Sequence, residues 1–420
     1  MDYDNIRFKK NLTAYLANVI MVGKSSPSQK KMAKETTEAA RKRNPKVYFH
    51  AIKRLTKWSK QSLIAISFAT STTSPTAVSF QQYIKNLYGT DPSPLPYKPT
   101  ESYLAVTDYD LDMACYKLSH NKATGMDGLK DTMIKALVKH HPFKKKLRLQ
   151  LQSWLNGENV PAYVTTARTI FLSKEATPYP TEGNVRIIAI LPALTKLYEL
   201  VILEKLNRES QRLQLVHENQ RGFVAGKSTL HNIHDVIRLI KNFQGRVNKH
   251  VEQGLPKTRR PQHFLIFLDL AKAFDSIDRS SLVTQLYDKR VNSTLVNAIR
   301  ALYSQTYMQP NNEKEPTLTE KGVMQGGVLS PKLFAIYVND MLVDLNHSGI
   351  VAWALADDIV VGAIGHLQLM AATKKINDHC RRLHLNINLK KSGIMTIRAD
   401  GRQKFKYQGD EIFGYPVVTE

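Results

Sequence analysis

The sequence contains almost no cysteine: Cys115 and Cys380 are the only two among its 420 residues. They form no Cys-x-x-Cys pair and no Cys/His cluster, which argues against a disulfide scaffold and a structural zinc site and fits a reducing, intracellular compartment. No run of about 18 uncharged apolar residues occurs, so we expect no membrane span. Residues 1–10 are too charged for a secretory signal, and their early acidic residues do not favour a mitochondrial presequence. Nucleus, cytoplasm and mitochondrion all stay open.

Acidic residues are also few relative to basic ones. The chain has 36 Asp and Glu against 60 Lys and Arg, a formal net charge of +24. This excess is larger than solubility requires, and the basic residues are spread along the chain, so we expect a polyanionic partner such as nucleic acid. A basic surface that only contacts solvent is the alternative. The length is sufficient for two or three domains.

Composition divides the chain into three parts. Residues 1–100 form a basic N-terminal extension that ends in a linker rich in Ser, Thr and Pro. Residues 101–262 form the second part, and its last stretch, 245–262, is polar, basic and interrupted by proline, so we expect an exposed loop there. Residues 263–420 form the third part.

Beyond residue 123, helical patterns alternate with β-rich runs. The expected strands are 169–172, 186–191, 264–268, 350–354, 359–363 and 393–398. The expected helices are 196–212, 230–244, 281–289, 295–307, 331–345 and 368–383. An earlier helix should begin at Thr107, whose hydroxyl can cap it with Asp110 as the partner in a capping box. We therefore expect a mixed α+β chain built around an antiparallel sheet.

Two adjacent carboxylates, Asp357 and Asp358, lie between the apolar runs 350–353 and 359–361. An unpaired buried charge costs several kcal/mol, so the pair belongs at a hairpin tip that faces water or metal. Asp269 ends another strand-like run. Three carboxylates on two strands are the ligands that a pair of Mg²⁺ ions needs for nucleotidyl transfer. For Asp269 alone, a turn or a helix cap is the alternative.

Phe274 follows Asp269 by five positions. Its ring could lie under the sugar of an incoming nucleotide and crowd a 2′-hydroxyl, and ordinary core packing is the alternative. Asp275 and Asp278 precede the helix expected from Ser281, which favours turn and cap roles for both.

A glycine-rich segment runs from Gly322 to Phe334. Three glycines surround Gln325, so the backbone of this loop can closely approach a flat ligand such as a base pair. Ser330 and Pro331 then start a helix. A plain glycine-rich turn is the alternative.

In order along the chain, these segments resemble the palm motifs of reverse transcriptases, of the type found in non-long-terminal-repeat retrotransposons and group II introns. The palm motifs are Asp269 with Ala273-Phe274-Asp275, Gln325-Gly326 with Leu329-Ser330-Pro331, and Ala356-Asp357-Asp358. The other similar segments are 123–128, 168–174 with 184–186, Lys196 with Glu199, 219–229 and 385–392. The resemblance covers the chain from about residue 48 to its last residue. It implies a right-hand polymerase, with fingers in 101–262 and, in 263–420, an antiparallel palm sheet flanked by helices.

The resemblance also implies an enzyme, an RNA-directed DNA polymerase that adds deoxynucleotides to a primer 3′-end. Asp269, Asp357 and Asp358 would hold two Mg²⁺ ions, for which Mn²⁺ could substitute, and Lys391 would assist protonation of the pyrophosphate. The implied nucleotide-binding residues are Lys174 and Arg186, which clamp the triphosphate, Leu270, the sugar gate Phe274, and Gln325 with Gly326 under the nascent base pair. The implied partners are an RNA template, a DNA or RNA primer and deoxynucleoside triphosphates.

The chain departs from the family pattern at three places. Leu355 stands where the family has an aromatic residue, and Ile187 stands where it has proline after the arginine. The sequence reaches Glu420 before the primer-grip turn, so we expect fingers and palm only, with the thumb missing or supplied by a partner chain. The chain would then be a truncated product, one piece of a split protein, or a family member with another use.

Two other functions share this pattern. A reverse-transcriptase-like RNA-binding protein, such as an intron maturase or a ribonucleoprotein component, would have the same basic charge and little or no polymerase activity of its own. An RNA-dependent RNA polymerase would share the palm, but Phe274 argues against it, because a ribonucleotide polymerase needs room at the 2′-hydroxyl.

Overall fold

The computed structural model describes residues 80–100, 103–118, 122–174, 185–255, 262–310, 315–397 and 404–406. The described residues divide into two units, one with residues 171–174 and 185–186 and the other with the described residues up to 170 and from 187 on. Most of the predicted N-terminal extension and the predicted approach to a primer grip lie outside the described residues. Among the described helices, none is long and apolar enough to cross a membrane.

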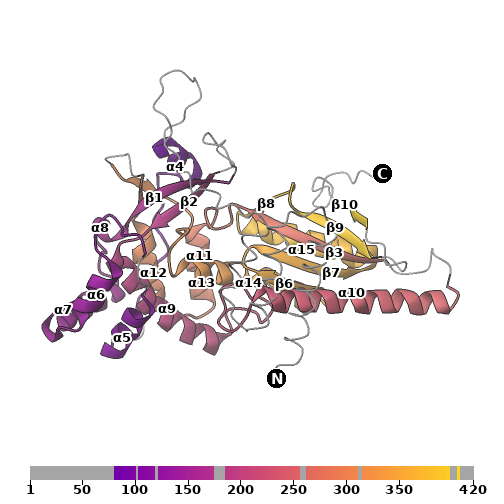
Figure 1. Cartoon of the computed structure of the whole chain (residues 1–420), viewed down its shortest axis with the longest axis horizontal. Helices are drawn as coiled ribbons and strands as arrows, with labels where there is room; N and C mark the ends of the chain where they lie inside the picture. Colours follow the sequence, from indigo (N-terminus) through magenta and orange to yellow (C-terminus); the bar gives the residue numbers. More distant parts are fainter. Residues whose placement is uncertain are drawn as a thin grey trace, which may run out of the picture. The chain divides into compact units, whose positions relative to one another are not determined.

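A six-stranded antiparallel sheet carries the palm motifs (Figure 1). Its strand order is β10-β9-β3-β7-β6, and β8 also pairs with β3. The strands are β3 (His263–Ala271), β6 (Val351–Leu355), β7 (Asp358–Ile364), β8 (Asn386–Ile387), β9 (Gly393–Ile397) and β10 (Lys404–Lys406). Every pairing in this sheet is antiparallel. The predicted α+β fold with an antiparallel palm sheet is therefore confirmed.

The two faces of this sheet are covered by different helices, because side chains alternate along a strand. On β3, Ile266 and Leu268 belong to the main hydrophobic core, and the sheet is flanked there by α14 (Asn339–His347) and α15 (Gly365–Arg382). On the opposite face, Leu265 and Phe267 pack with Phe243 of α10 (Thr229–Glu252). Figure 1 shows α10 running along the sheet.

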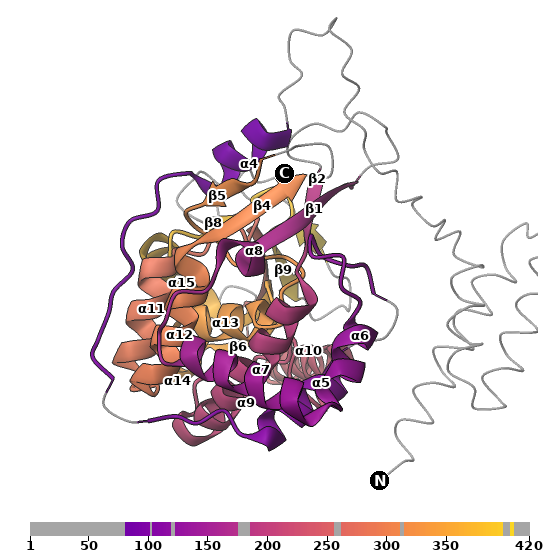
Figure 2. The same ribbon diagram turned by 90° about the vertical axis from the view of Figure 1, so that its left-hand side faces the viewer.

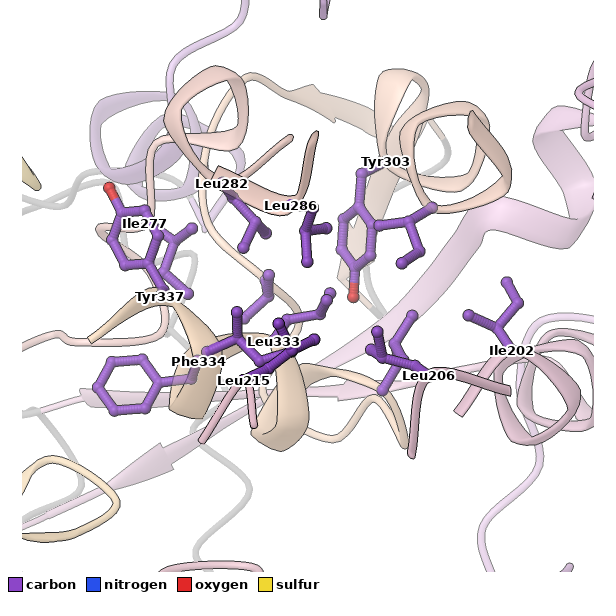
Figure 3. Close-up of a cluster of buried hydrophobic side chains, with 14 of the residues drawn as sticks. Ile202, Leu206, Leu215, Ile277, Leu282, Leu286, Tyr303, Leu333, Phe334 and Tyr337 are labelled. Atoms are coloured by element: carbon purple, nitrogen blue, oxygen red, sulfur yellow. The ribbon is translucent and has the colours of Figure 1, made fainter. Parts of the chain in front are cut away.

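The main core lies among the helices that follow and precede β3. They are α9 (Ala193–Leu213), α11 (Arg279–Asp288), α12 (Ser293–Ser304) and α13 (Ser330–Tyr337). Figure 3 shows side chains from all four helices meeting, including Leu206, Leu286, Tyr303 and Leu333. Each of these side chains is at most 4% exposed, so the helices are packed through a continuous apolar interior.

The earlier part of the chain adds short helices and a second sheet. The helices are α4 (Phe80–Tyr88), α5 (Asp108–Lys117), α6 (Asp131–Val138), α7 (His141–Leu155) and α8 (Ala162–Thr165). The sheet has the order β2-β1-β4-β5, from β2 (Val185–Ile190), β1 (Thr166–Ser173), β4 (Thr306–Pro310) and β5 (Thr317–Thr319). Figure 2 shows α5, α6 and α7 near α9, with which α5 and α6 make contact. The predicted capping box of Thr107 and Asp110 at the start of α5 is confirmed.

Three differences from the predicted elements bear on the fold. The predicted helix 331–345 is divided at Val338 into α13 and α14. The predicted helix 295–307 ends earlier, at Ser304, because the chain turns into β4, which pairs with β1. The loop predicted over 245–262 is wrong for its first part: α10 continues to Glu252, and Gly254, at φ +66°, follows its cap. Residues 245–252 are polar but contain no proline, so they extend a helix that the composition alone did not indicate.

Candidate active site

The register of the palm sheet brings two of the three predicted carboxylates together. Asp269 of β3 is paired directly with Asp358 of β7. Directly opposed residues in an antiparallel pair have Cα atoms about 4.5–5.5 Å apart and side chains on the same face of the sheet. Asp357 lies in the two-residue turn between β6 and β7, next to Asp358. The backbone therefore gathers all three positions at one end of the sheet.

The charges of these carboxylates act on one another. Burial raises the pKa of Asp357, and the charges of Asp358 and Asp269 raise it further, while Lys391 opposes the rise. Burial also raises the pKa of Asp358, again with a contribution from Asp269 and an opposing one from Lys391. Negative charge is thus concentrated at this end of the sheet, with Lys391 as the basic residue that acts on both carboxyls.

The turn at residues 388–392 holds Asp269. The amide Nδ2 of Asn388 donates to Oδ2 of Asp269 at 2.7 Å, and Nζ of Lys391 lies 3.7 Å from the same oxygen. The backbone is held too, because Asn388 N donates to Asp269 O at 2.8 Å and Asp269 N donates to Ser392 Oγ at 3.1 Å. Asn388 and Ser392 therefore position Asp269, a role that the sequence pattern alone did not assign.

The residues at this end of the sheet fit a divalent cation by their chemistry. In the described part of the chain, no three His, Cys, Asp or Glu side chains lie close enough together to hold a metal ion. Asp269, Asp357 and Asp358 nevertheless supply carboxylate oxygens, the ligands preferred by hard divalent ions. A bound cation would also offset the repulsion among these carboxylates, which adds to burial in raising the pKa of Asp357 and Asp358.

A buried glutamine fixes the turn that carries Asp357. Gln220 is 0% exposed, and its Oε1 accepts from the backbone N of Ala356 at 3.0 Å and of Gly222 at 2.9 Å. Its Nε2 donates to Ala356 O at 3.3 Å. Ala356 has φ +60°, a left-handed conformation that costs an L-residue roughly 1–2 kcal/mol. Gln220 binds both backbone polar groups of this strained residue and so keeps the turn in place.

The backbone around Gln220 adds to this contact. Arg221 N donates to Ala354 O of β6 at 2.9 Å. A Cβ atom added at Gly222 would lie 2.1 Å from the N of Ala356, so only glycine allows these two backbone segments to approach this closely. From the sequence, segment 219–229 was identified only as a motif of the family it resembles. Its contact partner in the hairpin lies more than a hundred positions later, and no local sequence pattern indicates a contact over that distance.

The ring of Phe274 packs against two other aromatic rings and stays partly exposed to solvent. Its ring stacks on Phe334 with centroids 4.9 Å apart and an interplanar angle of 18°. It meets Phe223 edge-on at 6.4 Å and 89°, and it is only partly buried. Leu270 differs, because its side chain is 3% exposed and lies in the main core. The side chain predicted at Leu270 to bind a nucleotide is thus turned into the interior.

The glycine-rich loop lies against β2. Gln325 O accepts from Ala189 N at 2.8 Å. Gly326 has φ +121°, and a Cβ atom there would lie 2.2 Å from Ala189 O. A residue with a side chain would therefore displace the loop, which accounts for glycine at this position.

Asp275 and Asp278 have different roles. Asp278 caps α11, as predicted, by accepting from Ser281 N at 2.6 Å. Asp275 lies in a turn, as predicted, with its N donating to Lys272 O at 2.9 Å. Its side chain does not cap α11, however: it is 5% exposed and accepts from Tyr88 Oη and from Nε2 of Gln325. Asp275 thus orients Gln325, the residue that the resemblance to reverse transcriptases implies lies beneath the nascent base pair.

The two basic residues predicted to clamp the triphosphate belong to the first of the two units, with residues 171–174 and 185–186. Lys174 follows the end of β1, and Arg186 lies in β2; both side chains are exposed. Their role as clamp residues stays a prediction.

Comparison with known proteins agrees with the motifs. The family profile of reverse transcriptases (RNA-dependent DNA polymerases) matches residues 173–412. The probable RNA-directed DNA polymerase from transposon BS of Drosophila melanogaster is 25% identical over 252 residues, which are 59% of this chain and 25% of that protein. The retrovirus-related Pol polyprotein from type-1 retrotransposable element R2 of Popillia japonica is 24% identical over 296 residues, 66% of this chain and 38% of that protein.

A third relative is the RNA-directed DNA polymerase from mobile element jockey of Drosophila funebris, 25% identical over 258 residues, 58% of this chain and 26% of that protein. The chain thus spans 25% to 38% of the length of these three relatives. Among solved structures, apo telomerase from Candida tropicalis aligns with a TM-score of 0.41 and 13% identity over 64% of this chain and 50% of that one, a likeness too slight to carry an argument. The family profile covers more than half of the sequence, and on that ground the chain belongs to the reverse transcriptase family.

Proposed function

We propose that this chain catalyses RNA-directed DNA synthesis and adds deoxynucleotides to the 3′-end of a DNA or RNA primer on an RNA template. The observation that carries the proposal is the direct pairing of Asp269 with Asp358 beside Asp357, in a chain of the reverse transcriptase family. Three gathered carboxylates on a sheet end are costly for stability unless they bind a cation.

Asp269, Asp357 and Asp358 would hold two divalent ions, which we propose to be Mg²⁺. When bound, such ions lower the pKa of the primer hydroxyl and neutralise the triphosphate and the leaving pyrophosphate. Asn388 and Ser392 orient Asp269, and Gln220 fixes the turn of Asp357.

The remaining predicted residues act on the nucleotide. Lys391 lies 3.7 Å from Asp269 with an exposed side chain, where it can donate a proton to the departing pyrophosphate. The partly buried ring of Phe274 borders the deoxyribose and excludes a 2′-hydroxyl. Gln325, oriented by Asp275, and Gly326 lie under the nascent base pair.

The basic charge supports binding of the template and primer. Lys174 and Arg186 are exposed and would clamp the triphosphate, where fixed positive charge offsets the charge of the transferred group. The net charge of +24 gives sequence-tolerant binding to phosphates. A protein that only binds RNA would need the basic surface but not three carboxylates in one place, which favours the polymerase over the RNA-binding alternative. A thumb supplied by a partner chain stays a prediction from the sequence.

A primer-extension assay tests the proposal. Purified protein, a DNA primer on an RNA template, deoxynucleoside triphosphates and Mg²⁺ should give extended product. The variant Asp357→Ala with Asp358→Ala should abolish extension and still bind the primer–template. Equal extension by this variant would show that the hairpin carboxylates do not carry the reaction.

A further inference from the structure

Phe223 combines two unfavourable properties. Its side chain is 65% exposed, and its backbone has φ +58°. Bulky residues rarely adopt this conformation, and residues held in it gather at functional sites, where the surroundings enforce it. A glycine at this position would avoid the backbone strain, and a polar residue would avoid the exposed ring, so fold stability gives no reason for phenylalanine here.

The neighbouring residues hold Phe223 at the catalytic hairpin. Gly222 lies directly against Ala356, and its N donates to Gln220 Oε1 at 2.9 Å. Gln220 in turn binds both backbone polar groups of Ala356. Phe223 is thus one residue from the point at which this segment contacts the turn of Asp357.

The ring of Phe223 ends a row of three aromatic rings. Phe334 is fully buried, and Phe274 stacks on it with centroids 4.9 Å apart. The rings of Phe223 and Phe274 are nearly perpendicular, at 89°, with centroids 6.4 Å apart. Burial falls outward along the row, so most of the Phe223 ring is accessible next to the side chain that we propose borders the nucleotide sugar.

We infer that Phe223 is a further nucleotide-binding residue, whose ring packs on the sugar and base of the incoming deoxynucleoside triphosphate beside Phe274. The inference rests on the proposed function, because it takes Phe274 to border that nucleotide. An aromatic ring contacts the flat apolar faces of any base, so the contact adds affinity without selecting among the four bases. It is a ground-state binding contact and should act on nucleotide affinity more than on the rate of transfer.

Substitutions at Phe223 separate binding from folding. Phe223→Gly removes the ring and the backbone strain together, so its melting temperature should equal or exceed that of the wild type. Phe223→Leu removes the aromatic face, and Phe223→Tyr keeps it. Two matched controls lie outside the site: Arg290→Gly at the same φ of +58°, and Tyr163→Leu at a similar exposure of 68%.

The assay is titration of a deoxynucleoside triphosphate, with Mg²⁺, onto the protein bound to a chain-terminated primer on an RNA template. Phe223→Gly and Phe223→Leu should raise the nucleotide Kd about tenfold, the scale of one stacking contact. In single-nucleotide extension they should raise KM similarly and leave kcat within about twofold. Phe223→Tyr and the two controls should match the wild type.

Three results would overturn the inference, and a fourth would overturn only the proposed function. Wild-type nucleotide affinity in Phe223→Gly and Phe223→Leu would exclude the contact. A loss of primer–template affinity with unchanged nucleotide Kd would assign the ring to the primer instead. A wild-type protein that binds nucleotide through Phe223 but does not extend a primer would refute the proposed function and leave this inference standing. A protein that neither binds nucleotide nor extends would refute both.

Discussion

Replacing Gln220 by methionine tests how the hairpin is held. Methionine has a similar length and fills the same space, but it cannot bind Ala356 or Gly222. The change removes three hydrogen bonds at 2.9, 3.0 and 3.3 Å and leaves two backbone N–H groups and one carbonyl without this partner. It also frees Ala356 from the contact that holds its φ of +60°.

The expected loss of stability follows from these contacts. Each hydrogen bond contributes a net ~0.5–1.5 kcal/mol, so the free energy of unfolding should fall by roughly 2–4 kcal/mol. The turn can then relax by about 1 Å, and a misplacement of that size costs on the order of a hundredfold in rate. Nucleotide incorporation should therefore fall about a hundredfold at temperatures where the variant is still folded.

A matched control comes from Gln152 of α7. Its side chain also makes three hydrogen bonds, accepting from Val106 N at 2.6 Å and donating to Leu104 O at 3.0 Å and to Asn156 Oδ1 at 2.8 Å. Gln152→Met should lower stability without lowering the incorporation rate per folded molecule. Chemical denaturation and single-turnover extension measure both quantities. Wild-type rates in Gln220→Met, or equal rate losses in both variants, would refute the positioning role.

Three further predictions concern the sugar gate, a buried acid and the basic charge. Phe274→Val should admit ribonucleotides, and unchanged deoxynucleotide selectivity in competition assays would exclude the gate. Burial raises the pKa of Glu199 to about 7 from the ordinary 4.5. Because the folded state then binds the proton more tightly than the unfolded state, the free energy of unfolding should fall by up to roughly 3 kcal/mol as the pH rises from about 4.5 to about 7. Glu199→Gln keeps an oxygen to accept from Val328 N and Leu329 N and should remove this dependence on pH. Melting temperatures that change equally with pH in both proteins, measured from pH 5 to 8, would contradict the prediction. Affinity for RNA should decline steeply on a logarithmic plot against salt, and a flat response in filter binding would remove the argument from net charge.

Much of the palm could be predicted from the sequence because its signals are local. Apolar runs of strand length around Asp357-Asp358 and before Asp269 predicted the hairpin and the strand, and the structure has β6, β7 and β3 there. The cap of Thr107 depended on residues three positions apart. Such patterns are set by side-chain alternation and by hydrogen bonds within one turn.

The parts that were missed depend on contacts between distant segments. Gln220 and Ala356 are separated by 136 positions, and nothing in the sequence around Gln220 indicates its partner. Asp275 was assigned to a turn or a helix cap from its proximity to α11; it lies in a turn, but its side chain binds Tyr88 and Gln325. Strand β4 replaced the end of a predicted helix because β1 and β5 supply its pairing. Tertiary pairing overrode local propensity at each of these places.

The most direct test of the account is the single-turnover rate of Asp269→Asn. Asparagine keeps the shape of the side chain and can still contact Asn388, but it removes the charge opposite Asp358. Asp278→Asn is the matched control, since Asp278 caps α11 and has no proposed role in catalysis. The account predicts that Asp269→Asn lowers the incorporation of one deoxynucleotide by roughly 10²–10³-fold or more and that Asp278→Asn leaves it near the wild-type rate. Incorporation by Asp269→Asn at the wild-type rate would contradict the claim that this carboxylate acts with Asp357 and Asp358.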